Sequence, residues 1–462
     1  MPRFRPCTIG DGRARAAAEC ADLAVPLDPD DPEGETLTLA LARLPARRAV
    51  AGTAPFTMIA GGPGQSAIES WPMLAHAFRH IARDRDVILI DQRGTGGSAR
   101  LDCPEAPPSA DGRVTLDLEH VRTETGDCLR ELPRDPRWFT TSVAVRDLER
   151  VRERLGIERW NLYGVSYGTR VAQHYARRYP ERVRTMILDA VLPPDLPLGP
   201  DIAPFAARAL ELVFTRCADD PHCASRFPAI GERTLGWLEE LERTPLEVGH
   251  EDFASGEWRE TRFGAAELAA VLRLMLYDAR TASLLPSMLD AALADGHVAP
   301  LVRQSRMQSE SLGRTLASGM HHAIVCTEDV PRIDADAAAR SVDTWLGAAL
   351  LESLSASCAD WPTGIIDEDF AEPLRVDVPT LLLSGEADPI TPPAYGERVL
   401  EMLPRAHHIV LRGQGHTQAP LGCVPRLMAR FVESADPLAP ELDCLDRLDP
   451  APFFVDANGP RP

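Results

Sequence analysis

Short apolar segments that end in glycine-rich turns recur along this chain, with amphipathic helices between them. In order they are FTMIAGGPG (56–64), DVILIDQRG (86–94), the helical SVAVRDLERVRERLG (142–156), RWNLYGVSYG (159–168) and RTMILDAV (184–191). Such an alternation makes consecutive strands parallel, because each helix carries the chain back across the sheet. The order therefore predicts an α/β fold with a mostly parallel sheet covered by helices on both faces.

The alternation is interrupted between residues 198 and 372. There the sequence has helical periodicity, as in APFAARALELVFTRCA, with few segments typical of strands. Strand-like segments return at VPTLLLSGEADP and AHHIVLRGQGH, and a last helix is expected near 425–431. Because 462 residues exceed what one compact core usually organises, we expect a core made of 1–197 and 373–462, with a helical cap inserted at 198–372.

Before the first of these segments, CADLAVPLDP and GETLTLALARLP predict a β-hairpin, since two strand-like runs flank the turn-rich DPDDPEG. No apolar run approaches the roughly 18–20 residues that span a bilayer. The first twenty residues also lack the apolar core of a secretory signal. Membrane insertion is therefore not expected.

The charged residues exclude several classes of function. The formal net charge is −20 and the sequence pI is about 5.1. Such a surface repels phosphate backbones, so nucleic-acid binding is not expected. All 49 basic residues are arginine, which excludes Schiff-base, pyridoxal-phosphate and phosphate-loop chemistry that depends on lysine.

The ten cysteines fall as near neighbours, and no C-x-x-C pattern occurs. They are Cys7 and Cys20, Cys103 and Cys128, Cys217 and Cys223, Cys326 and Cys358, and Cys423 and Cys444. Zinc-ribbon and thioredoxin chemistry are therefore not expected. Two interpretations stay open at this point: five local disulfides in an oxidising compartment, or buried reduced thiols in a cytosolic protein.

A serine flanked by two glycines marks the fourth segment. Gly164-Val165-Ser166-Tyr167-Gly168 lies where a strand gives way to a helix. A sharp turn there would expose the hydroxyl at the carboxyl edge of the sheet, beside a helix amino terminus that favours negative charge. Side chains at the two glycine positions would collide with neighbouring backbone in such a turn. The pattern predicts Ser166 as a nucleophile.

A serine hydroxyl needs a base and an oriented acid to react. Asp388 ends one strand-like segment downstream, and His416 ends the next. Ser…Asp…His is the chain order expected for this type of turn. We expect His416 to take the hydroxyl proton and return it to the leaving group, while Asp388 fixes the imidazole tautomer. Asp189, after the strand-like RTMIL, is an alternative acid.

The reaction also needs donors for the charge that develops on the former carbonyl oxygen. We expect one donor to be the backbone N–H of Tyr167, directly after the nucleophile. The loop AGGPGQSA (60–67) is expected to supply the other, because Gly61 and Gly62 let the backbone approach a substrate closely and Pro63 stiffens the loop.

Five motifs in this order resemble the α/β-hydrolase aminopeptidases, the group of prolyl iminopeptidases and tripeptidyl aminopeptidases. The motifs are GGPG, DQRGTGGS, GVSYGT, GEADPITP and GQGH, and the likeness extends over most of the chain. The resemblance implies an α/β-hydrolase fold in which Ser166, Asp388 and His416 form the triad. It also implies that Gly62 and Tyr167 donate to the oxyanion and that peptides bind under a helical cap.

Two departures from the prolyl iminopeptidases favour the tripeptidyl branch. Those enzymes typically carry histidine before the two glycines, where this chain has Ala60. Their second motif usually has cysteine and arginine where this chain has Thr95 and Gly97.

Many members of the group are exported and disulfide-bonded. Together with sequence proximity, this leads to the hypothesis that the neighbouring cysteines pair with one another. A periplasmic or secreted location is then expected, and a cytoplasmic one if the thiols are reduced.

The resemblance favours a serine aminopeptidase that acts on peptides with a free amino terminus. A carboxylesterase or amidase using the same triad is the alternative, and a catalytically inactive binding protein is disfavoured because the motifs are intact. A substrate ammonium must be desolvated against carboxylates. Glu328 and Asp329 in the cap are the first candidates for this role, and Glu69 after the glycine loop is another.

Other polar residues are expected to be structural. Arg93 in DQRGTGGS is expected to make contacts below the site. His321, His322 and Cys326 match no common metal-site spacing, so we expect neither a metal nor a cofactor. The oligomeric state is left open.

Overall fold

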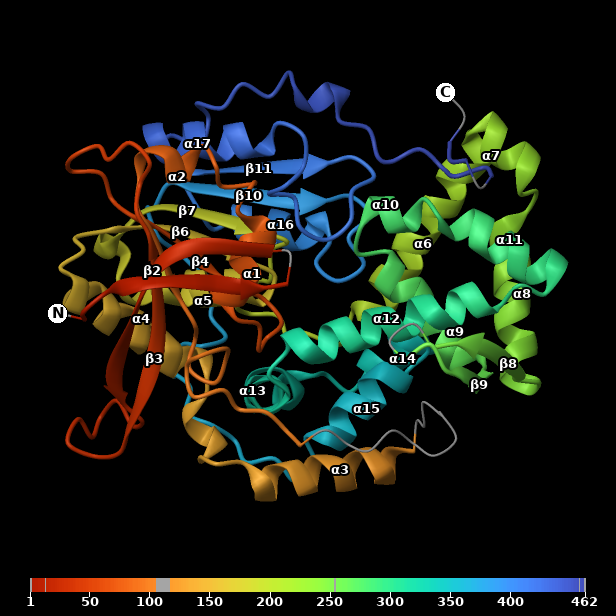
Figure 1. Ribbon diagram of the computed structural model, residues 1–462, viewed down its shortest axis with the longest axis horizontal. Coiled ribbons are helices and arrows are strands. Elements are labelled where there is room, and N and C mark those ends of the chain that lie inside the picture. The colour runs from red at the N-terminus through yellow and green to blue at the C-terminus, as the bar shows by residue number, and fades with distance from the viewer. Residues whose placement is uncertain (1, 13, 105–116, 253–254, 457, 461–462) are drawn as a thin grey trace.

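The computed structural model describes residues 2–12, 14–104, 117–252, 255–456 and 458–460 (Figure 1). The strands are β1 (Arg5–Asp11), β2 (Ala14–Pro26), β3 (Thr36–Leu44), β4 (Phe56–Ile59), β5 (Val87–Ile90), β6 (Trp160–Val165), β7 (Val183–Asp189), β8 (Leu246–Glu251), β9 (Trp258–Phe263), β10 (Thr380–Gly385) and β11 (Ala406–Leu411).

Helices of the sheet-containing part are α1 (Ala67–Leu74), α2 (Ile81–Asp84), α3 (Leu118–Glu131), α4 (Thr141–Leu155), α5 (Tyr167–Arg178), α16 (Pro393–Leu400) and α17 (Val424–Ser434). Between β7 and β10 lie α6 (Ile202–Asp219), α7 (Pro221–Arg226), α8 (Ile230–Arg243), α9 (Ala265–Met275), α10 (Ala279–Ala282), α11 (Leu285–Asp295), α12 (Ala299–Thr315), α13 (Ser318–Ile324), α14 (Ala337–Val342) and α15 (Ala349–Ser357). A π-helical turn, Val325–Asp329, follows α13.

One large sheet forms the core, in the order β1-β2-β3-β5-β4-β6-β7-β10-β11. In this sheet, β5, β4, β6, β7, β10 and β11 run parallel to one another. At the other end of the sheet, β1, β2 and β3 pair antiparallel, and β3 also pairs antiparallel with β5. The predicted α/β class and mostly parallel sheet are confirmed. Because parallel strands share a carboxyl edge, the turns after β4, β6, β10 and β11 meet at that edge.

Apolar side chains pack against both faces of the sheet. One cluster includes Val145 and Leu148 of α4 and Val171 and Tyr175 of α5. The opposite cluster includes Trp71 of α1 and residues of α17. Each fully buried large apolar side chain contributes about 1.5–3 kcal/mol relative to exposure, so these layers fix the carboxyl edge firmly.

The predicted helix before β6 is α4, and local sequence explains its ends. The hydroxyl of Thr140 accepts a hydrogen bond from the N–H of Val143 at 3.4 Å. Gly156 ends the helix in a left-handed conformation, with φ of 68°. The predicted hairpin is β2–β3, and β1 adds a strand to it that the sequence did not indicate.

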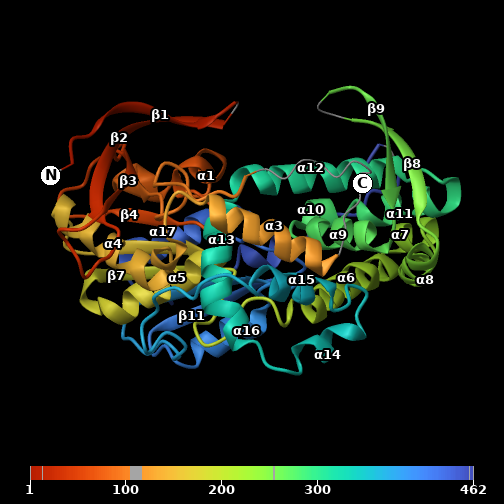
Figure 2. The ribbon, with the colours of Figure 1, turned by 90° about the horizontal axis from the view of Figure 1, so that it is seen from below.

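The segment between β7 and β10 has its own apolar cluster, formed mainly by α6, α8, α9, α11 and α12. It lies beside the sheet at the end to which the arrows of β10 and β11 point (Figure 1). The strands β8 and β9 pair as an antiparallel hairpin at the edge of this segment (Figure 2). A helical segment was predicted here, and this two-stranded hairpin was not. The division at 198 and 372 stays a prediction.

All five neighbouring cysteine pairs form disulfides: Cys7–Cys20, Cys103–Cys128, Cys217–Cys223, Cys326–Cys358 and Cys423–Cys444. The pairing is the one that proximity and the family resemblance predicted. Along the described ranges, no helix is both long enough and apolar enough to cross a bilayer.

Candidate active site

Ser166 sits on a strained turn between β6 and α5. Its φ of 55° and ψ of −126° are unusual for a residue with a side chain. A Cβ on Gly164 would lie 2.4 Å from the carbonyl oxygen of Gly168, and one on Gly168 would lie 2.3 Å from that of Ile59. Both glycines are therefore required for the turn, as the sequence predicted.

His416 and Asp388 form a hydrogen-bonded pair on the two neighbouring strand ends. Nδ1 of His416 lies 2.8 Å from Oδ2 of Asp388. The backbone N–H groups of Ile390 and Thr391 donate to the other carboxylate oxygen at 2.8 and 2.9 Å. The Thr391 hydroxyl donates to Oδ2 at 2.9 Å and lies 3.4 Å from His416 Nδ1. These contacts hold the carboxylate, and through it the imidazole, in a single orientation.

The environment of His416 favours its protonated form. Burial alone would lower the pKa of His416, but the charges of Asp388 and Asp189 outweigh it and raise the pKa above 6.5. Tyr277, in the turn after α9, accepts a hydrogen bond from the His416 N–H on its carbonyl oxygen at 2.7 Å. Its ring meets the imidazole edge-on at 5.2 Å between centroids. The segment between β7 and β10 thus supports the base directly.

Asp189, the alternative acid, has other partners. Its carboxylate accepts hydrogen bonds from the Tyr163 hydroxyl at 2.8 Å and from the N–H groups of Gln418 and Ala419, both at 2.8 Å. Burial raises the pKa of Asp189 to about 6. Asp189 therefore anchors the loop that follows His416, while Asp388 contacts the imidazole.

The glycine loop after β4 passes directly over Ser166. A Cβ on Gly61 would lie 3.0 Å from the Cβ of Ser166. Gly62 has a φ of 108° that favours glycine. Tyr167 is the first residue of α5, where backbone N–H groups have no partner within the helix. Gly62 and Tyr167 thus both lie beside Ser166. Their role as oxyanion donors stays a proposal.

Ser166 and His416 line one cavity of about 1030 Å³, together with Gly61 and Gly62. An apolar part of its wall consists of Leu198, Ile202, Val325, Leu350, Leu351 and Leu354. Glu69 lines the cavity too, and within the described part of the chain it is the lining residue that carries a carboxylate. Its side chain is 54% exposed and lies 3.8 Å from Arg100.

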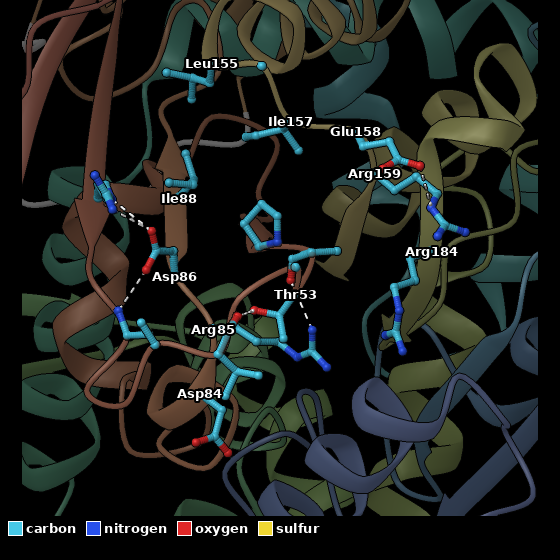
Figure 3. A pocket seen from close by; sticks show the side chains of 18 of the residues that line it. Thr53, Asp84, Arg85, Asp86, Ile88, Leu155, Ile157, Glu158, Arg159 and Arg184 are labelled. Carbon is cyan, nitrogen blue, oxygen red and sulfur yellow. Dashed lines mark hydrogen bonds and ion pairs between the residues drawn. The ribbon is translucent and has the colours of Figure 1, made fainter.

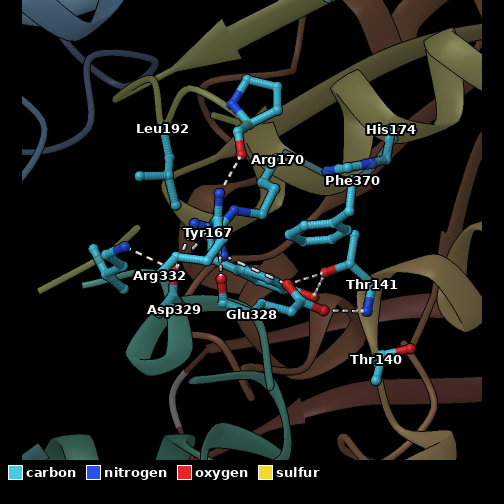
Figure 4. Close-up of polar contacts among 12 residues, drawn as sticks. Thr140, Thr141, Tyr167, Arg170, His174, Leu192, Glu328, Asp329, Arg332 and Phe370 are labelled. Carbon is cyan, nitrogen blue, oxygen red and sulfur yellow. Dashed lines mark hydrogen bonds and ion pairs between the residues drawn. The ribbon is translucent and has the colours of Figure 1, made fainter. Parts of the chain in front are cut away.

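The structure places Glu328 and Asp329 away from this cavity. Both are fully buried, and both contact the guanidinium of Arg170 on α5 (Figure 4). The expectation that they bind a substrate ammonium is corrected accordingly, because their charge is balanced inside the protein. Sequence reasoning could not show this, since Arg170 lies more than 150 positions earlier.

Arg93 has the structural role expected of it: it is fully buried and binds Asp147 through two nitrogens at 2.7 and 2.8 Å. His321, expected to be structural, lines the cavity, and its Nδ1 lies 3.3 Å from the Pro63 carbonyl oxygen. Burial lowers the pKa of His321 and so favours its uncharged form.

A second cavity opens at the amino ends of the strands, among residues that include Thr53, Asp86 and Arg184 (Figure 3). It contains neither Ser166 nor His416. Arg184 donates there to backbone carbonyl oxygens of Val432 and Glu433 at the end of α17. This arginine thus complements a helix carboxyl terminus and has a structural explanation.

The parallel sheet, the strained serine after β6 and the Asp–His pair at the same edge define an α/β-hydrolase. A family model described as alpha/beta hydrolase fold matches residues 54–222, and one described as TAP-like protein matches residues 343–444. The chain therefore has the hydrolase fold that its motifs predicted.

Individual proteins extend this similarity. The serine protease Hip1 of Mycobacterium tuberculosis is 26% identical over 474 residues, covering 90% of this chain and 85% of that protein. The tripeptidyl aminopeptidase of Streptomyces lividans is 29% identical over 195 residues, covering 38% of this chain and 36% of that protein. A solved proline iminopeptidase of Mycobacterium smegmatis covers 89% of this chain and 97% of its own, with 17% identity and a TM-score of 0.37.

The sequence matches agree with the family resemblance: the chain is similar to proteins of the α/β-hydrolase aminopeptidase group. They support a serine peptidase as its broad class.

Proposed function

We propose that the protein is a serine aminopeptidase that cleaves peptides near a free amino terminus. The observation that carries this proposal is the contact of 2.8 Å between His416 and Asp388, with His416 and Ser166 lining one cavity. A histidine oriented by a buried carboxylate beside a strained serine is the arrangement that acyl transfer requires.

In the proposed mechanism, Ser166 Oγ attacks the scissile carbonyl carbon while His416 takes the hydroxyl proton. The oxyanion is held by the N–H groups of Tyr167 and Gly62. The C–N bond then breaks, and the leaving amine takes the proton from His416. Water repeats the sequence on the acyl-enzyme, with His416 as base and then as acid. Asp388 stays ionised and stabilises the imidazolium in both halves.

Glu69 is the proposed site for the substrate ammonium. It lines the same cavity as Ser166, and its carboxylate is partly open to solvent rather than enclosed. The ammonium group of a bound substrate can lose its water there, because it pairs with the Glu69 carboxylate. The substrate then shields this carboxylate from solvent. The apolar wall with Leu198 and Leu351 offers a surface for side chains of the released peptide.

The test compares turnover of a tripeptide anilide with a free amine and its N-acetylated form. We expect the free substrate to be preferred, and Glu69→Gln to raise KM for it by about five- to thirtyfold. This change in KM corresponds to a loss of about 1–2 kcal/mol in binding free energy. That loss is larger than the usual contribution of an exposed ion pair and smaller than that of a hydrogen bond to a buried charge.

Glu239→Gln, on an exposed position of α8, is the matched control and should change neither substrate. Equal turnover of free and acetylated substrates by the wild type would contradict the aminopeptidase proposal. Such a result, with rapid hydrolysis of a short-chain nitrophenyl ester, would favour the esterase alternative.

A further inference from the structure

Glu328 is fully buried in the π-helical turn that follows α13, yet its carboxylate has well-defined partners on the core (Figure 4). One oxygen accepts a hydrogen bond from the Thr141 N–H at 2.6 Å. The other accepts from the Thr141 hydroxyl at 2.8 Å and from Arg170 at 3.4 Å. The carboxylate therefore binds the amino terminus of α4 and the helix that carries Ser166.

The contacts continue from Thr141 to Tyr167. The Thr141 Oγ1 lies 2.7 Å from the Tyr167 hydroxyl, which in turn accepts from Nε2 of Gln92 at 3.0 Å. A carboxylate can only accept, so the single hydroxyl proton of Thr141 points to Glu328. Tyr167 must then donate to Thr141, and every hydroxyl in the chain from Gln92 to Glu328 has one defined orientation.

Tyr167 is also the residue whose backbone N–H is the proposed oxyanion donor. Its ring is buried and anchored at the hydroxyl end by this chain of hydrogen bonds. Arg170, one turn along α5, is anchored by Glu328 and by Asp329 at 2.7 Å. The first turn of α5 is thus held at Tyr167 and at Arg170. Tyr167 is connected to Glu328 through Thr141, and Arg170 contacts Glu328 directly.

Resting on the proposed acyl-transfer function, we propose that Glu328 is a positioning residue that fixes the Tyr167 backbone for oxyanion binding, acting through Thr141 and Arg170. Preorganised donors lose catalytic effect when they are displaced by fractions of an ångström. Glu328 touches neither substrate nor Ser166, so its effect appears in the stabilisation of the tetrahedral intermediate and not in substrate binding.

The acceptor role described above belongs to the ionised form of Glu328. Burial raises the pKa of Glu328 to about 7, against the lowering effect of Arg170 and of the Thr141 N–H. Asp329 adds a further raising effect. Every polar partner of the carboxylate is a donor, so a neutral amide in its place would direct an NH₂ group at another donor.

The test uses Thr141→Val and Glu328→Gln, with Thr141→Ser as the conservative variant that keeps the hydroxyl. We expect Thr141→Val and Glu328→Gln to lower kcat by about 10- to 100-fold, less than the 10²–10³ that follows removal of an oxyanion donor. KM should stay unchanged, and Thr141→Ser should retain most of the wild-type kcat. Thermal unfolding checks that each variant is folded.

Two further measurements separate positioning from a structural role. Asp329→Asn weakens the anchoring of the same arginine without touching Thr141, so it should lower stability and lower kcat of the folded enzyme clearly less than Thr141→Val does. The affinity of phenylboronic acid, whose serine adduct resembles the tetrahedral intermediate, should fall in Thr141→Val in parallel with kcat.

A folded Thr141→Val enzyme with wild-type kcat and wild-type boronate affinity would overturn the inference. So would an equal loss of kcat in Asp329→Asn. All variants are assayed with a nitrophenyl ester as well as with a peptide anilide. If the wild type hydrolyses the ester and not the peptide, the peptidase proposal is contradicted. In that case the kcat of the variants on the ester still tests the role of Glu328.

Discussion

At the residue scale, His416 is held from three directions. Asp388 fixes Nδ1, Thr391 contacts both members of the pair, and Tyr277 supports the backbone and one edge of the ring. The imidazole is thereby kept in one tautomer, and in the proposed mechanism its Nε2 takes the proton of Ser166. The same carboxylate that orients the ring also raises its pKa.

This raised pKa predicts the acidic limb of the pH profile. A protonated His416 cannot accept the Ser166 proton, so kcat/KM should be lost as pH falls through the raised pKa, at a midpoint above 6.5. Asp388→Asn removes the main raising charge, so the limb should move to lower pH. Its plateau should also fall by about 10⁴-fold, because the tautomer is no longer fixed.

The pH dependence of kcat/KM for the wild type and Asp388→Asn checks this expectation. Because burial also raises the pKa of Glu328 to about 7, Glu328→Gln is the control and should leave the midpoint of the His416 limb in place. An unmoved limb in Asp388→Asn would assign the titration to a group other than His416.

Ser166, Asp388 and His416 could be proposed from the sequence, because each follows a strand whose carboxyl end must reach the same edge. Thr391 and Tyr277 had no comparable signal. Thr391 lies within the GEADPITP motif, but its role depends on a side-chain contact. Tyr277 lies in the turn between α9 and α10, and the position of this turn against the core could not be read from the sequence. Glu328 and Asp329 were expected to bind the substrate ammonium, and their pairing with Arg170 was not foreseen.

At the scale of elements, the turn from β6 to α5 depends on close contact with the loop after β4. Gly168 approaches the carbonyl oxygens of Ile59 and Ala60 so closely that a Cβ would lie 2.3 and 2.6 Å from them. Backbone atoms cannot move away as a flexible side chain can. The two loops that carry the proposed oxyanion donors are therefore packed directly against each other.

Gly168→Ala should both destabilise the protein and lower kcat. We expect a loss of about 1–3 kcal/mol in the free energy of unfolding, the usual cost of overpacking, measured by urea denaturation. Gly236→Ala is the matched control, because it lies within α8 and a Cβ there meets nothing within 4 Å. It should be neutral or stabilising by about 0.5–1 kcal/mol. Wild-type stability and kcat in Gly168→Ala would contradict the close packing.

The elements predicted best were those with a clear period. Buried parallel strands and the amphipathic α4 were visible in the sequence, whereas β1 and the hairpin β8–β9 were not. The two hairpin strands, LEVGHE and WRETRF, are largely exposed and rich in charge. They have too little apolar alternation to indicate a strand, and their pairing is settled by contact between them.

At the scale of the whole molecule, the segment between β7 and β10 does more than cover the site. Tyr277 reaches the loop of His416, and Glu328 binds Thr141 of α4 and Arg170 of α5. The disulfide Cys326–Cys358 ties the π-helical turn to the end of α15 within this segment. Its overall helical character could be predicted, but these contacts join residues far apart in sequence, and packing alone determines them.

The central claim is that Ser166 is the nucleophile of this hydrolase, and active-site labelling tests it most directly. The protein is treated with a fluorophosphonate, and the adduct is located by mass spectrometry of peptides while turnover is followed in parallel. We predict one adduct, on Ser166, that appears in step with the loss of turnover, and a fall in kcat of about 10⁴–10⁶-fold in Ser166→Ala. Labelling of a different residue together with loss of turnover, or a Ser166→Ala protein that keeps more than about a tenth of wild-type kcat, would contradict the account.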